Sequence, residues 1–197
     1  MPSHSNPERT ERERAEVTRR ELLTRMGTGL VAITVSSPEG WISPTSARAK
    51  GLKLTHFNVG EQRTLDALAE VLLPGARDAG LSHYVDDQLG RDEPLFVLRY
   101  MDYGGEYLDF YRRGLRSLNQ VSRDLHRQPF DELSMPQQTA LVRTLSAESP
   151  DRWKGPPAPL FYFVLRNDAV DVFYGTQAGF EKLGIPYMAH VVPPQDW

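Results

Sequence analysis

The sequence predicts a mainly α-helical protein, a compact bundle of about five to six helices that ends in an irregular C-terminal tail. Apolar residues recur at three- and four-residue spacing over several long stretches, which is the period of helices with one buried face. Glycine and proline close these stretches. The chain has 197 residues and 40% of them are hydrophobic, so one core of ordinary size can form. We therefore expect a single helical domain over residues 50–197, preceded by a disordered or cleavable N-terminal signal over residues 1–49.

Two helices are predicted in the first part of this domain. Residues 61–73 carry one apolar stripe and end at Pro74-Gly75, which stops a helix. Residues 82–89 form a shorter second helix. The candidate inward residues of the two helices are Leu65, Leu68, Ala69, Leu72, Tyr84, Val85 and Leu89.

Three further helical regions follow. Residues 94–126 predict two stretches that meet near Gly104-Gly105, because paired glycines favour a break. A helix over residues 135–147 has the clearest start, since Ser134 can cap it, Pro136 lies in its first turn and Gln137 stands at the capping-box position.

The last predicted helix, over residues 160–174, is crowded with aromatic side chains, for which we favour burial in the core. The segment from Gly175 to the C-terminus contains three glycines and three prolines, so it predicts the irregular tail rather than another long helix.

Composition excludes several kinds of chemistry. The chain carries 23 Lys and Arg against 26 Asp and Glu, mixed along the sequence, so we expect no nucleic-acid partner. It has no cysteine, which excludes disulfides, thiolate-bound zinc, iron–sulfur clusters and covalently attached c-type haem. We therefore expect no cofactor in this chain, and redox chemistry around it must be carried by another protein.

The N-terminal region resembles an export signal. Residues 1–17 are polar and predict disorder, and the apolar run over residues 26–35 is too short to span a bilayer, which needs roughly 20 apolar residues. Between them lies a pattern similar to the twin-arginine signal, with Leu in place of the commonest Phe and Thr24 in place of Lys. An amphipathic helix with incidental arginines is the alternative interpretation. The signal residues are Arg19, Arg20, Leu22 and Leu23.

Small residues also suggest where such a signal would end. Ala47 and Ala49 stand at the two positions that a signal peptidase reads, which predicts cleavage after Ala49. The twin-arginine route carries proteins that have already folded, often with a cofactor or partner. A chain with no cofactor motif has no need of that route for itself, so a partner that holds the cofactor is implied. We expect an exported, periplasmic protein, which partners could bring to the membrane surface.

No catalytic constellation stands out, and we predict no catalytic, cofactor-binding or metal-binding residue. No two of the five histidines have the helical spacing that would aim both at one metal, and no nucleotide-binding glycine loop is present. Asp86-Asp87 and Asp168 with Asp171 offer carboxylates for a glycosidase-type pair. We favour solvated helix faces for them, because adjacent helical residues point about 100° apart. The histidines are His4, His56, His83, His126 and His190.

The tail contains many apolar side chains, although it is predicted to have little regular structure of its own. Such side chains must be buried, either against their own domain or in a groove of another subunit, and both alternatives stay open. The candidate partner-binding residues are Phe180, Ile185, Tyr187, Met188, His190 and Trp197.

Several blocks, in this order and spacing, resemble the gluconate 2-dehydrogenase subunit 3 family. They cover the chain from about Gly60 to the C-terminus. The blocks are Leu65-Asp66-Ala67-Leu68-Ala69-Glu70-Val71-Leu72-Leu73-Pro74-Gly75, Tyr111-Arg112-Arg113-Gly114-Leu115, Pro129-Phe130 with Leu133-Ser134 and Gln137-Gln138, and the tail stretches over residues 175–180 and 184–190.

The resemblance implies a non-catalytic small subunit that accompanies a large flavoprotein of the glucose–methanol–choline oxidoreductase family. That partner binds FAD and oxidises a sugar, a sugar acid or a glycoside, and a cytochrome c often accepts the electrons. The small subunit commonly carries the twin-arginine signal for the pair. Two other functions stay open: a self-sufficient exported enzyme, such as a hydrolase acting on sugars, and a transient export chaperone.

Overall fold

The computed structural model describes residues 33–38, 40–175, 179 and 182–184. The chain divides into two units, of which residues 33–175 form one. The other, residues 1–32 and 176–197, lies almost wholly outside the described residues. The unit over residues 33–175 is mainly helical, which confirms the predicted fold class.

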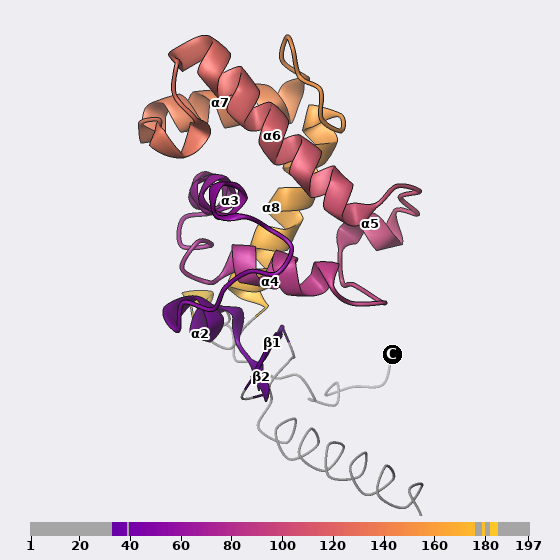
Figure 1. The fold of residues 1–197 in the computed structure, drawn as a ribbon. Coiled ribbons are helices and arrows are strands. Elements are labelled where there is room, and N and C mark those ends of the chain that lie inside the picture. Colours follow the sequence, from indigo (N-terminus) through magenta and orange to yellow (C-terminus); the bar gives the residue numbers. More distant parts are fainter. Residues whose placement is uncertain (1–32, 39, 176–178, 180–181, 185–197) are drawn as a thin grey trace, which may run out of the picture. The chain divides into compact units, whose positions relative to one another are not determined.

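The described residues form seven α-helices and one short antiparallel hairpin (Figure 1). In the hairpin Val35 pairs with Ile42 and Ser37 with Gly40. The elements in chain order are β1 (Val35–Ser37), β2 (Gly40–Ile42), α2 (Pro44–Ala49), α3 (Val59–Leu72), α4 (Leu81–Leu89), α5 (Val97–Tyr100), α6 (Tyr107–His126), the 3-10 turn η1 (Phe130–Glu132), α7 (Met135–Ala147) and α8 (Ala158–Tyr174).

Helix α8 lies in the middle of this unit and contacts α3, α4, α5, α6 and α7. In Figure 1 it runs between the end formed by α6 and α7 and the end formed by α4 and α2. Its inward side is fully buried, including Phe161, Val164 and Leu165. The core prediction for this aromatic helix is therefore right for Phe161, whereas Phe163 on the opposite side is 45% exposed.

A glycine sets how closely α6 approaches α8. A Cβ atom added to Gly114 would lie only 2.2 Å from Cε2 of Phe161, so no larger residue fits here without moving one helix. Gly114 is one of the residues that carry the family resemblance, and its lack of a side chain therefore has a packing reason.

Helix boundaries follow capping groups. Helix α3 begins at Val59, two residues earlier than predicted, because Asn58 and Glu61 form a capping box with bonds of 2.9 and 3.0 Å. Helix α7 begins and ends as predicted, with the expected box between Ser134 and Gln137. The predicted break is also confirmed, since α5 ends at Tyr100 and α6 begins at Tyr107.

The hairpin and α2 were not predicted, and they lie within the region assigned to the signal. The contact-defined unit begins at Ile33, before the predicted start at Lys50. Helix α2 starts at a pattern the sequence does contain, since Ser43 caps it by accepting a bond from Ser46 N at 3.1 Å and Pro44 occupies its first turn. The same pattern, a capping serine followed by a proline in the first turn, correctly predicted the start of α7 at Ser134.

Candidate functional site

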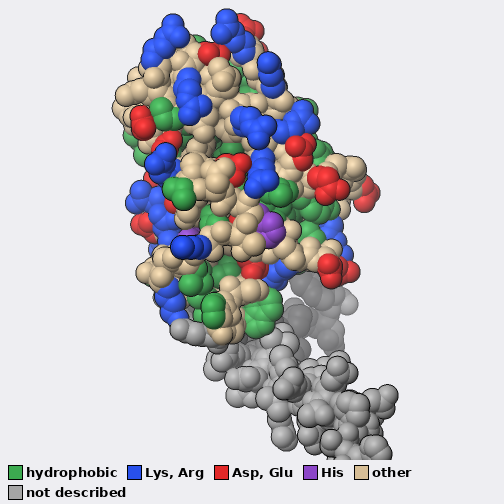
Figure 2. Space-filling view, in the orientation of Figure 1, with side chains coloured by type: hydrophobic (Ala, Val, Ile, Leu, Met, Phe, Trp, Pro, Cys, Tyr) green, Lys and Arg blue, Asp and Glu red, His purple; other side chains and the backbone are tan. Residues whose placement is uncertain are grey.

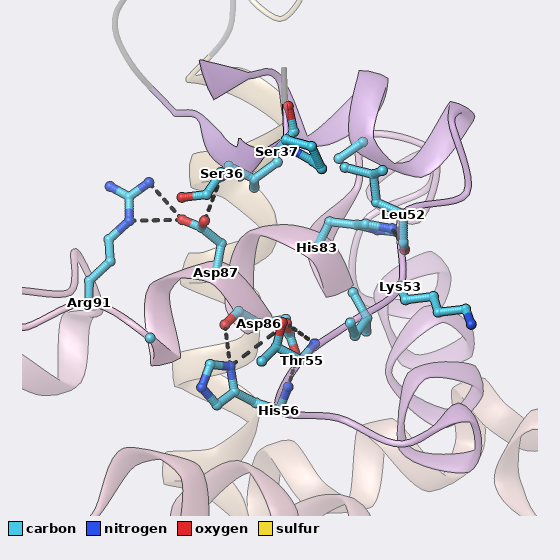
Figure 3. A pocket seen from close by; sticks show the side chains of 15 residues that line it. Ser36, Ser37, Leu52, Lys53, Thr55, His56, His83, Asp86, Asp87 and Arg91 are labelled. Carbon is cyan, nitrogen blue, oxygen red and sulfur yellow. Dashed lines mark hydrogen bonds and ion pairs between the residues drawn. The ribbon is translucent and has the colours of Figure 1, made fainter. Parts of the chain in front are cut away.

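A hollow of about 470 Å³ lies between the hairpin, residues 52–56 and α4 (Figure 3). Polar and charged side chains line much of its wall, including those of Asp86, Asp87 and Arg91. In the close-up the two aspartates point away from each other, Asp87 toward the hairpin and Asp86 toward residues 55 and 56. Adjacent helical residues are expected to point in different directions, and the two aspartates do so.

Asp86 organises the segment that leads into α3. Its carboxylate accepts bonds from three successive backbone N–H groups, those of Thr55 at 2.7 Å, His56 at 2.8 Å and Phe57 at 2.9 Å. The His56 ring returns the contact, with Nδ1 at 2.9 Å from the Asp86 carbonyl oxygen. On the other side of this segment Arg112 of α6 donates to the His56 carbonyl. Asp86 is 5% exposed and serves as a backbone anchor.

Asp87 holds the hairpin. Its Oδ1 accepts from Ser36 N at 2.6 Å, and its Oδ2 lies 2.6 Å from Nη2 of Arg91. Arg91 also donates to the Thr34 carbonyl at 2.8 Å and places its guanidinium 4.9 Å from the ring centre of Trp41. Both oxygens of Asp87 are thus occupied by the chain itself.

A third carboxylate is buried between α6 and α8. Asp168 is 1% exposed, and its Oδ2 accepts from the Tyr111 hydroxyl at 2.7 Å. Its Oδ1 has no hydrogen-bond partner among the described residues. Burial raises the pKa of Asp168 to about 7, although the Tyr111 bond opposes that rise, and the nearby charge of Asp171 adds to it. Burial and the neighbouring Asp168 also raise the pKa of the Tyr111 hydroxyl.

The prediction of solvated helix faces was therefore wrong for Asp86, Asp87 and Asp168, and only Asp171 is exposed. The physical reason is that residues 33–57 and Tyr111 supply hydrogen-bond donors that cover these carboxylates. Partners so distant in the sequence cannot be predicted from helical periodicity. Both oxygens of Asp86 and of Asp87, and one oxygen of Asp168, accept bonds from the chain itself, so these carboxylates stabilise the fold.

His56 and His83 line the same hollow, whereas His126 is the last residue of α6. His83 is 5% exposed, with Nε2 at 3.0 Å from the Leu52 carbonyl oxygen, and burial lowers its pKa. His126 approaches only the amide of Gln137, at 3.4 Å. Within the described ranges, no group of three or more His, Asp or Glu side chains is placed to hold a metal ion.

Charges of both signs share the molecular surface. In Figure 2 Lys and Arg side chains gather over the upper part of the view, where α6 and α7 lie, with acidic side chains between them. Arg113, Arg116 and Arg123 belong to the exposed side of α6. In the part of the chain that the structure describes, no helix is both long enough and apolar enough to cross a membrane.

Two sets of predicted residues fall outside the described residues: the export signal, Arg19, Arg20, Leu22 and Leu23, and the partner-binding residues of the tail, Phe180, Ile185, Tyr187, Met188, His190 and Trp197. The predicted cleavage residues are described. Ala47 is fully buried in α2, and Ala49 is the exposed last residue of that helix.

A model of the gluconate 2-dehydrogenase subunit 3 family matches residues 60–193 of the chain. The chain belongs to this family. No curated protein and no solved structure matches it. As a subunit 3 protein it is one chain of a multi-subunit dehydrogenase, which implies a catalytic partner.

The match confirms the resemblance read from the sequence blocks. It begins one residue after the first residue of α3, passes through α8 and continues into the tail as far as residue 193. The match therefore includes the helical unit from α3 onward and most of the segment that follows Gly175.

Proposed function

We propose that this chain is a non-catalytic small subunit that binds, stabilises and co-exports the catalytic flavoprotein of a sugar, gluconate or glycoside dehydrogenase. The partner is a large FAD-dependent subunit of the glucose–methanol–choline type, with a cytochrome c as candidate electron acceptor. The pair works in the periplasm. The observation that carries this proposal is the family match over residues 60–193, because a subunit 3 protein is part of a multi-subunit dehydrogenase.

The geometry of the helical unit supports a binding role over a catalytic one. Its buried carboxylates are occupied by backbone donors and by Tyr111, as described above. Its core is formed by its own helices, so the unit can present surfaces to a partner without needing one to fold. A protein that binds only the folded partner stabilises that partner by mass action.

The tail deletion tests the binding role. A chain that lacks residues 176–197 is expected to lose co-purification with the flavin-containing large chain, because the tail carries the apolar anchors and belongs to the family-defining region. The deletion starts after Gly175, since the N–H of Gly175 caps α8 by donating to the Asp171 carbonyl at 2.8 Å. The measurement is the ratio of flavin absorbance to small subunit after affinity purification.

The deleted chain must remain folded for this result to count, and residues 33–175 form a separate contact unit, so its helical circular dichroism should persist. A tail-less chain that still purifies with a full complement of flavoprotein would contradict the docking role of the tail.

The paired arginines test co-export. Replacing Arg19 and Arg20 together by Lys keeps the charge but removes the pair that the export pathway reads, so both the small subunit and the flavoprotein should accumulate in the cytoplasm. Arg12→Lys with Arg14→Lys is the matched control, with the same charge and the same number of changes outside the pair. Periplasmic dehydrogenase activity is the readout, and unchanged activity in the Arg19 and Arg20 double variant would rule out co-export by this signal.

A further inference from the structure

We propose that residues 33–57 form an N-terminal clasp that is a permanent part of the folded subunit. Any cleavage that removes the export signal then takes place before Ile33 and not after Ala49. The part of this proposal that concerns processing rests on the export role proposed above. The clasp contains the hairpin, α2 and the segment that enters α3.

The small-residue triplet that predicts cleavage lies inside a folded helix. Ala47 is fully buried, and the turn around the Ala49–Lys50 bond is closed by backbone bonds from Lys50 N to Ser46 O at 2.9 Å and from Leu52 N to Ala47 O at 3.1 Å. A protease binds its substrate as an extended segment, which this turn cannot become without unfolding α2. A chain exported after folding would present the triplet in this closed form.

Helix α2 contacts the residue before α4 and forms an ion pair with α3. Gly80, just before α4, has φ of 90°, and a Cβ atom there would lie 2.3 Å from the Pro44 carbonyl oxygen. The first residue of α2 therefore rests directly on a position that only glycine can occupy. Arg48, between the two alanines of the triplet, forms a 2.8 Å ion pair with Asp66 of α3, in which the side chains are 25% and 16% exposed.

The hairpin is tied to α4 through two partly buried charges. Asp87 and Arg91 together hold the backbone at Ser36 and Thr34, and their side chains are only 10% and 25% exposed. Val35 between these two backbone contacts is 3% exposed. Cleavage after Ala49 would remove Ser36 from Asp87 and Thr34 from Arg91, although these two side chains would still pair with each other, and it would leave Asp66 of α3 without Arg48.

The mass of the exported subunit tests the processing. The full chain is produced together with its catalytic partner, the pair is collected from the periplasm, and the small subunit is measured intact. We expect an N-terminus at or before Ile33, and a peptide that contains Trp41. An N-terminus anywhere from Thr34 to Lys50 would overturn the proposal. If the pair remains in the cytoplasm, the proposed export role fails, and the clasp is then decided by the next measurement.

Tryptic digestion of the intact full chain tests the clasp without export. Asp87→Asn weakens the contacts to Ser36 and Arg91, so the clasp should open more often, and cleavage after Lys50 and Lys53 should accelerate roughly tenfold. The control is Asp151→Asn, an exposed aspartate between α7 and α8, whose cleavage rate should match that of the unchanged chain. Equal rates in all three proteins would overturn the proposal.

Gly80→Ala supplies a second variant from a different contact. The added Cβ atom would collide with the Pro44 backbone, and the alanine would have to keep a left-handed backbone conformation. Helix α2 should therefore detach, and the bonds after Lys50 and Lys53 should become sensitive to trypsin. Circular dichroism checks that the other helices remain. Resistance equal to that of the unchanged chain would show that α2 is not seated on Gly80, and would count against the clasp.

Discussion

Replacing Asp86 by alanine is expected to lower the midpoint temperature of thermal unfolding by about 10 °C. The carboxylate accepts bonds from the backbone N–H groups of Thr55, His56 and Phe57, and alanine would leave all three donors unpaired. A buried donor without an acceptor costs about 1–3 kcal/mol, and partial entry of water reduces the total to roughly 3–5 kcal/mol. Circular dichroism at 222 nm against temperature measures this loss.

Two further variants make the result specific. Asp86→Asn keeps one acceptor oxygen and should cost about half as much as the alanine variant, because one of the two oxygens that serve the backbone is replaced by a donor. Asp92→Ala removes an exposed carboxylate of the same type and should change the midpoint by less than about 2 °C. An alanine variant at position 86 as stable as the one at position 92 would show that Asp86 does not anchor this segment.

The sequence predicted the elements whose start, end and buried face are determined by residues within the element or next to it. Helix α7 was placed correctly because its cap, its proline and its apolar period all lie within the helix and its flanks. The break before α6 was placed correctly because Gly104-Gly105 marks it. Helix α3 was predicted to start two residues late, since Asn58 was not recognised as its cap.

The parts that were missed depend on contacts between distant segments. The hairpin has three residues in each strand, too few for a period to emerge, and it is held by Asp87 of α4 and by Arg91 just after this helix. Helix α2 had a readable start at Ser43-Pro44, but its position inside the apparent signal region favoured the other interpretation. The partners of Asp86 and Asp168 lie 29 to 57 positions away along the chain, beyond the reach of helical spacing.

The family resemblance and the structure together explain several of the blocks that carry it. The first block covers most of α3 and the turn after it, where Leu65, Leu68 and Ala69 are buried. The second contains Tyr111, which bonds Asp168, and Gly114, which lets α6 approach α8. The residues of these blocks therefore pack the core, whereas the part of the match beyond residue 175 belongs to the other unit, residues 1–32 and 176–197. That division is the reason for directing the partner-binding test at the tail.

The contribution of Asp168 to the stability of the subunit is expected to fall as pH rises from about 4 to about 7, and Asp168→Asn should remove this contribution. Burial raises the pKa of Asp168 from 3.8 to about 7, so the folded chain retains a proton that the unfolded chain has already released in this range. Because the folded state binds more protons, each rise in pH favours unfolding until the folded-state pKa is passed. A shift of about three units corresponds to on the order of 4 kcal/mol over the whole window.

Asparagine keeps an oxygen that can accept from the Tyr111 hydroxyl but cannot ionise, so it mimics the protonated carboxyl. The variant should match the unchanged chain near pH 4 and become progressively the more stable of the two as pH rises, by several kcal/mol above about pH 7. Urea titrations of both proteins across this range measure the difference, with exposed Asp151→Asn as a control whose pH dependence should parallel that of the unchanged chain. A constant difference between Asp168→Asn and the unchanged chain at all pH values would show that Asp168 does not titrate in this window, because only a group that changes its protonation on unfolding can change the slope.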